Sequence, residues 1–109
     1  MALETQTFGR VIASKRKELK LSQKELAEKI LKEDAEPITP QYLNDIEHDR
    51  RNPSSDQLVS QFAEKLQLQS DYLYFLAGRM PADLRHKRLT PEAVTKAMTA
   101  FRRSATSSR

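Results

Sequence analysis

The side chains best suited to chemistry in this sequence lie on one short segment, residues 38–47. Thr39 is a good N-cap and Pro40 fits the first helical position, so this segment is predicted to be a helix. The apolar Leu43 and Ile46 then face one side, and the other side carries Gln41, Asn44, Asp45 and His48. Such groups hydrogen-bond in two directions, which is the chemistry that reads base edges in a major groove. An ordinary solvated surface helix would show the same pattern.

Other residue types in the chain give little support for an enzyme. The sequence has two His, two Gly and no Cys. Neither His48 nor His86 has neighbours at metal-ligand spacing, and no Gly-rich phosphate loop is present, so we expect no metal and no cofactor. Glu25 and Glu28 each precede a lysine by four residues, which is typical of a solvated face rather than of paired catalytic acids. No catalytic residue is predicted.

Length and hydropathy indicate a soluble cytoplasmic protein. A chain of 109 residues suits one domain with a short extension. The N-terminus shows no secretory signal, and the longest apolar run, 72–77, is far shorter than the roughly 20 residues of a membrane span. The absence of cysteine fits a reducing cytosol.

Charge is unevenly distributed along the chain. Residues 79–109 contain eight Lys and Arg against two Asp and Glu, whereas residues 1–78 contain 11 against 13. A basic tail on a nearly neutral domain is a common sign of a polyanionic partner. Solubility alone would also explain it.

The elements that must position residues 38–47 are predicted to be helices as well. A first helix covers about 7–19, with Thr7 as its cap, and a second starts with a Ser22–Glu25 capping box and runs to about Lys32. A fourth begins after Ser54 or Ser55. A fifth begins at a Ser70 cap, with Tyr72, Leu73, Phe75 and Leu76 inward, and ends at Gly78. A sixth runs from Thr90 to Arg102–Arg103, and residues 104–109 are expected to be disordered. No strand pattern appears, so the fold class is all-α.

Four stretches together resemble the Xre/Cro-like helix-turn-helix family of phage and bacterial regulators. They are Leu21-Ser-Gln-Lys-Glu-Leu-Ala27, Thr39-Pro-Gln-Tyr-Leu-Asn-Asp-Ile-Glu47, Arg50-Arg-Asn-Pro53 and Leu73 to Gly78. The resemblance covers about residues 7–78. It implies a five-helix DNA-binding domain at 1–78, followed at 79–109 by a basic linker, an amphipathic sixth helix and a disordered tail.

The same resemblance implies roles for individual residues. The third helix would be the recognition helix, reading bases through Gln41, Tyr42, Asn44 and Asp45. Phosphate contacts are expected from Ser22, Gln23, Thr39, Arg50, Arg51 and Asn52; the exposed N–H groups of the helix start at Ser22 support this independently. Glu47 projects close to the apolar side, where an unpaired carboxylate would be costly. The resemblance implies that it forms a structural ion pair with Arg16.

Three departures from the family pattern affect these expectations. Lys15 stands where the family usually has an aliphatic residue. Lys20 stands where the family often has glycine, and a left-handed conformation there would cost about 1 kcal/mol or more. The connection between the second and third helices, 31–37, is longer than usual and includes Glu33, Asp34 and Glu36. This loop must point away from phosphates if DNA binding is to survive.

We therefore expect a transcriptional repressor that binds double-stranded DNA sequence-specifically and reads a palindromic operator as a homodimer. The sixth helix carries an apolar stripe that would join the two copies: Ala93, Val94, Ala97, Met98 and Phe101. Tyr72 and Tyr74 are candidates for the surface that it meets. Two alternatives stay open: the stripe folds back on its own domain, or the chain is a protein-binding module such as an antitoxin.

Overall fold

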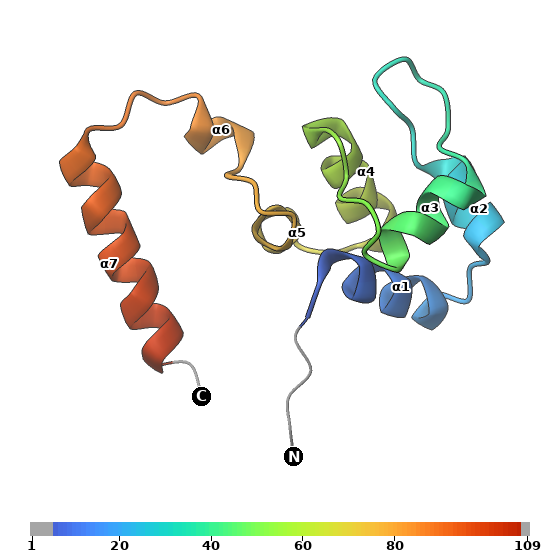
Figure 1. Cartoon of the computed structure of the whole chain (residues 1–109), viewed down its shortest axis with the longest axis horizontal. Helices are drawn as coiled ribbons and strands as arrows, with labels where there is room; N and C mark the ends of the chain where they lie inside the picture. The colour runs from blue at the N-terminus through green and yellow to red at the C-terminus, as the bar shows by residue number, and fades with distance from the viewer. Residues whose placement is uncertain (1–5, 108–109) are drawn as a thin grey trace.

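A computed structural model describes residues 6–107 of the chain. Within that range it has helices and no strand, as predicted: α1 (Phe8–Glu18), α2 (Gln23–Lys29), α3 (Pro40–Glu47), α4 (Asp56–Leu66), α5 (Ser70–Leu76), α6 (Ala82–Arg85) and α7 (Pro91–Ser107). The first five helices form one cluster, and α7 lies to one side of it, reached through α6 (Figure 1). None of the helices is long and apolar enough to cross a membrane in the part of the chain that is described.

The core lies between α1, α2, α3, α4 and α5. Phe8 of α1 meets Phe62 of α4 edge to face, with ring centroids 5.7 Å apart. The fully buried large side chains are Phe62, Ile12, Leu26, Ile30, Leu43, Ile46, Leu66, Leu73 and Val59. Leu43 and Ile46 belong to this set, as the sequence pattern predicted, so the core holds α3 by its Leu43–Ile46 edge and leaves the amide side outward.

Capping residues begin most of the helices. The side chains of Thr7, Ser22, Thr39 and Ser55 each accept a backbone N–H of the first helical turn, and Glu25 completes the capping box of α2. Ser55 rather than Ser54 caps α4. The prediction for Ser70 was wrong: Gln69 is the N-cap of α5 and makes no side-chain cap bond. Lys20 is left-handed, with φ of 61°, as the family pattern implied.

The connection from α2 to α3 is a small hairpin. Helix α2 ends at Lys29 and not near Lys32 as predicted, because Ile30 is extended and Leu31 forms an isolated bridge with Pro37. Two glutamine side chains of α4 hold the Leu31 backbone: its N–H donates to Gln61 Oε1 (3.0 Å) and its carbonyl accepts from Gln57 Nε2 (3.2 Å). The bridge closes the longer connection, so α2 and α3 still pack against each other. That the hairpin avoids phosphates stays a prediction.

The start of α1 lies directly against the end of α3. A Cβ at Gly9 would lie against the backbone carbonyl oxygens of Ile46 and Glu47, so only glycine fits without a shift. The Asp49 carboxylate bridges the two elements: it accepts from the Thr7 hydroxyl (2.7 Å) and from the Gly9 N–H (3.2 Å). These contacts hold the start of α1 against the C-terminal end of α3.

The chain from α5 onward differs from its prediction in four respects. A short helix, α6, interrupts the linker, and α7 extends to Ser107, well beyond Arg103, while residues 108–109 lie outside the described range. Tyr74 is only 7% exposed, so it belongs to the core and cannot form a docking surface. Phe75, predicted to point inward, is 60% exposed and stacks on Phe101 of α7, with ring centroids 5.8 Å apart.

Candidate nucleic-acid interface

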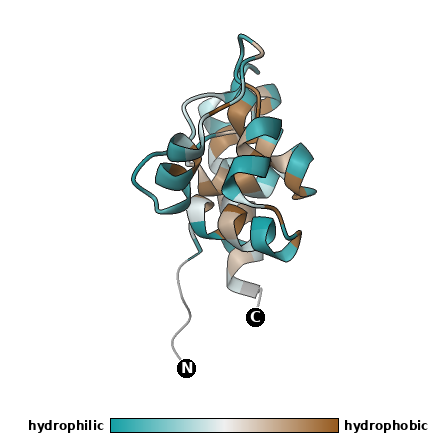
Figure 2. Cartoon of the chain, turned by 90° about the vertical axis from the view of Figure 1, so that its right-hand side faces the viewer, coloured by the Kyte–Doolittle hydropathy of each residue, from teal (hydrophilic) through white to brown (hydrophobic). Residues whose placement is uncertain are grey.

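The outward side of α3 carries the amide and acidic groups that were predicted to read bases. Gln41 is exposed, and Asn44 and Asp45 are half-buried. Figure 2 views the chain from the side on which α2 and α3 lie in Figure 1, and the helices nearest to the viewer are mostly hydrophilic on their outer faces. Gln41 Nε2 donates to Asp45 Oδ1 (3.1 Å), and His48 Nδ1 lies 2.8 Å from the backbone carbonyl oxygen of Asn44. Gln41 and Asp45 therefore order each other, and the α3 backbone orders His48, before any ligand arrives.

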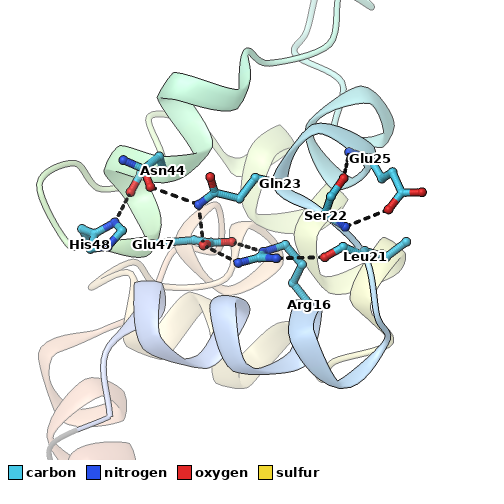
Figure 3. A network of polar contacts seen from close by, with 8 residues as sticks. All are labelled: Arg16, Leu21, Ser22, Gln23, Glu25, Asn44, Glu47 and His48. Carbon is cyan, nitrogen blue, oxygen red and sulfur yellow. Dashed lines mark hydrogen bonds and ion pairs between the residues drawn. The ribbon is translucent and has the colours of Figure 1, made fainter.

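A hydrogen-bond chain joins this face to α2. Gln23 Nε2 donates to Glu47 Oε1 (2.9 Å) and to Asn44 Oδ1 (3.1 Å), as Figure 3 shows. Because a carboxylate can only accept, Glu47 sets which end of the Gln23 amide faces it. Asn44 must then present its carbonyl oxygen to Gln23, and its amide nitrogen points away from the network (Figure 3). Gln23 thus orients the amide of Asn44.

The ion pair between Arg16 and Glu47 lies beneath that chain. Arg16 Nε donates to Glu47 Oε2 (2.6 Å), and Nη2 donates to Oε1 (3.0 Å). Arg16 Nη1 also donates to the Leu21 carbonyl oxygen (2.8 Å), which ties the connection before α2 to the same pair. The two side chains are only 10% and 3% exposed, so the pair is a structural link from α1 to α3.

The start of α2 forms one edge of the surface. The capping box uses the N–H groups of Ser22 and Glu25, and the first helical N–H groups, of Gln23 and Lys24, are the ones that a helix start leaves for an external acceptor. The hydrogen bond from the Ser22 backbone lowers the pKa of Glu25, which favours the charged carboxylate that completes the cap. The Gln23 side-chain amide is committed to Asn44 and Glu47, which leaves its backbone as the group for a phosphate.

The loop after α3 forms the opposite edge. Arg50 and Arg51 both approach the Asp45 carboxylate, at 3.3 and 3.6 Å, and the Arg51 guanidinium lies 5.4 Å from the centroid of the Tyr42 ring. The Tyr42 hydroxyl lies 3.4 Å from Ser54 Oγ. Asn52 and Thr39 are exposed, although the Thr39 hydroxyl already accepts the Tyr42 N–H (3.0 Å). Contacts of all these residues with DNA stay predictions.

One feature of the surface was not predicted. An open groove of about 840 Å³ runs between α1 and the end of α3, and its walls include the buried pair together with Gln23 and His48. Helix α1 contributes Arg10, Ser14 and Lys17 to it. Their spacing along α1 places them on one helical face. This polar face could have been predicted from the sequence, but only the apolar stripe of the same helix was interpreted. Among the described residues, no cluster of His, Cys, Asp and Glu suits a metal ion.

Comparison with known proteins agrees with this geometry. A family model described as helix-turn-helix matches residues 12–73, from the second turn of α1 into α5. Searches of curated proteins and of solved structures returned no match. The matched range is more than half of the chain and includes α2, its connection and α3. The chain therefore belongs to the helix-turn-helix family of Xre/Cro-like DNA-binding regulators.

Proposed function

We propose that the chain is a transcriptional repressor that reads a palindromic operator in double-stranded DNA with α3 in the major groove. The observation that carries this is the outward face of α3, on which Gln41, Asn44 and Asp45 lie between two edges that suit phosphate contacts. An α-helix fits a major groove of B-form DNA, and amide side chains bond there to base edges. Repression follows from occupancy, since a bound operator is closed to other proteins. A role on DNA is also the reason to expect the protein in the cytoplasm.

The hydrogen bonds of α3 sharpen the proposed base contacts. Asn44 faces Gln23 with its side-chain carbonyl oxygen, so it would approach DNA as a donor, toward a major-groove acceptor such as O6 or N7 of guanine, N7 of adenine or O4 of thymine. A bidentate pair with adenine, which uses both ends of an asparagine amide, would require Asn44 to leave Gln23. Asp45 is held by Gln41 and Arg50 at Oδ1 and by Arg51 near Oδ2, and since a carboxylate has about four acceptor sites it could also accept from cytosine. Tyr42, whose ring lies under the Arg51 guanidinium, would contact the bases through the edge of that ring.

The proposed phosphate contacts fall into two groups, one at each edge of the α3 surface. At the start of α2, Ser22 and Gln23 would hold one backbone strand, with Thr39 at the start of α3 nearby in the helix-turn-helix. After α3, Arg50, Arg51 and Asn52 would hold the other; the two arginines are 59% and 61% exposed. Guanidinium groups can bond a phosphate while keeping a carboxylate partner, because each has five N–H donors. On this assignment, residues 1–78 are the DNA-binding domain.

We further propose a homodimer formed through α7 and the exposed end of α5. Helix α7 is exposed along the described length of its side chains, and Val94, Met98 and Phe101 remain 40%, 38% and 54% exposed after Phe101 stacks on Phe75. Large apolar side chains in one continuous stripe favour a protein partner over water. A two-fold dimer would place two recognition helices about 34 Å apart, one turn of DNA.

The same exposed stripe supports the alternative of a module that binds another protein, such as an antitoxin. Selection of bound sequences from a random pool of duplex DNA separates the two. A repressor enriches one palindromic sequence, and the spacing of its halves reports the dimer. Recovery of no preferred sequence, together with a second protein that co-purifies in equal amount, would support the antitoxin instead.

A further inference from the structure

The segment between α5 and α7 is held against the start of α4. We call residues 79–88 the basic arm: it carries Arg79, Arg85, Lys87 and Arg88 against the single acid Asp83. Arg79 Nη1 donates to Asp56 Oδ1 (2.9 Å), and Arg85 forms an ion pair with the same carboxylate. Arg85 also donates to the Met80 carbonyl oxygen (2.9 Å), which closes the arm on itself. The basic arm lies outside the range that the family model matches.

Contacts place this arm at one edge of the α3 surface. Asp56 follows Ser54 by two residues, and Ser54 Oγ lies 3.4 Å from the Tyr42 hydroxyl of α3. Arg51 packs over the same Tyr42 ring. The basic arm therefore continues the edge formed by the loop after α3, which is opposite the edge formed by Gln23. Figure 1 shows α6 beside the end of α4 at which that helix begins.

The charges at this edge favour a polyanion. Alone, Asp56 would repel phosphate, but two guanidinium groups on one carboxylate reverse the local sign. Hydrogen bonds from Arg85, and after it from Arg79, hold the pKa of Asp56 below its usual range, so the carboxylate remains charged and both arginines stay in place. The side chains of Arg79 and Arg85 are 31% and 39% exposed, and each guanidinium has more donors than Asp56 uses.

We propose that the basic arm is a second site for the DNA backbone, in which Asp56 positions Arg79 and Arg85 against phosphates and the exposed Lys87 and Arg88 extend the contact. The arm would hold the strand that flanks α3 on the side of Arg50 and Arg51. This inference rests on the proposed function, since it assumes that α3 lies in the groove. It adds affinity without sequence information, because phosphates are the same in every sequence.

The test is the salt dependence of affinity, measured with the full-length chain on a selected duplex and on a random one. A plot of log affinity against log salt has a negative slope. In R79Q/R85Q this slope should become shallower by about 1.8 on both duplexes, the value for two lost phosphate contacts. The ratio of specific to random affinity should stay unchanged. K29Q/K65Q removes the same charge at the C-terminal ends of α2 and α4 and should leave the slope as in the wild type.

A second variant covers the case in which R79Q/R85Q does not fold, which circular dichroism reports. Lys87 and Arg88 are exposed, so K87Q/R88Q keeps the fold and should also lower the slope. If the folded arm variants have the same slope as K29Q/K65Q, the basic arm does not contact DNA, and the ion pairs of Asp56 serve only to hold the arm against α4. A wild type that binds every duplex equally would instead contradict base reading by α3, and a slope change in the arm variants would still be visible.

Discussion

Arg16 and Glu47 form a buried, doubly hydrogen-bonded ion pair that joins α1 to α3. Glu47 also fixes Gln23, and Gln23 fixes Asn44. The orientation of an outward amide on α3 thus depends on a charge pair in the interior. We therefore expect the pair both to stabilise the fold and to position Asn44 through Gln23.

Removing one partner of the pair should destabilise the fold. We expect Glu47→Ala to lower the free energy of unfolding by about 3 kcal/mol, because it leaves the Arg16 charge buried without a partner. Thermal or urea unfolding of Glu47→Ala, Arg16→Ala and the double variant gives the coupling. Losses that simply add in the double variant would show that the two residues do not interact.

Gly9 is expected to be indispensable to the contact between α1 and α3. Gly9→Ala should destabilise the chain by about 1–3 kcal/mol, since the new methyl group meets backbone carbonyl oxygens that cannot rotate away. Ser14→Ala, at an exposed position of the same helix, is the matched control and should be close to neutral. Equal melting temperatures for the two variants would contradict the close approach.

The Asp56 pairs predict a dependence of stability on acid. The pKa of Asp56 in the folded chain is below the ordinary 3.8, so its contribution is fully present above pH 3.8 and is lost as the pH falls below that value. The difference in melting temperature between wild type and Asp56→Asn should be constant from pH 7 to pH 5 and shrink in more acidic solution. A difference that grows on acidification would have the wrong sign for this account.

The proposed dimer predicts a change in molecular mass. M98E/F101E puts two charges into the exposed apolar stripe of α7 and should convert the dimer to a folded monomer. T99E/T106E adds the same charge on another face of α7 and should remain dimeric. Light scattering of the full-length chain measures both. If M98E/F101E keeps the mass of a dimer, the interface lies elsewhere.

Most of the fold could be predicted because local rules act where the helices begin. Ser22 with Glu25, and Thr39 with Pro40, set helix starts through bonds within one turn. Apart from the cap of α5, which is Gln69 and not Ser70, the errors fall where contacts between distant residues decide the structure. Helix α2 ends at Lys29 since Gln57 and Gln61, about 30 positions later, hold Leu31 extended.

The site was harder to predict because its geometry depends on pairs of distant residues. The outward side of α3 follows from its periodicity, but nothing local indicates that Gln23 would use its amide on Asn44 and Glu47. Tyr74 was expected at the surface and is buried, whereas Phe75 was expected inward and is exposed, for a similar reason. The Tyr74 hydroxyl reaches the Asp56 carbonyl oxygen (3.5 Å), a contact 18 positions away in sequence, and Phe75 then faces α7.

The central claim is that α3 reads base edges, and the most direct test compares affinities for the selected duplex and for random duplex DNA. Gln41→Ala and Asn44→Ala should each weaken binding to the selected duplex by roughly 1–3 kcal/mol, because each removes a hydrogen bond to a base. Binding to random duplex, which depends on phosphates, should stay nearly as in the wild type. Equal losses on the two duplexes, or no loss on either, would contradict base reading by α3.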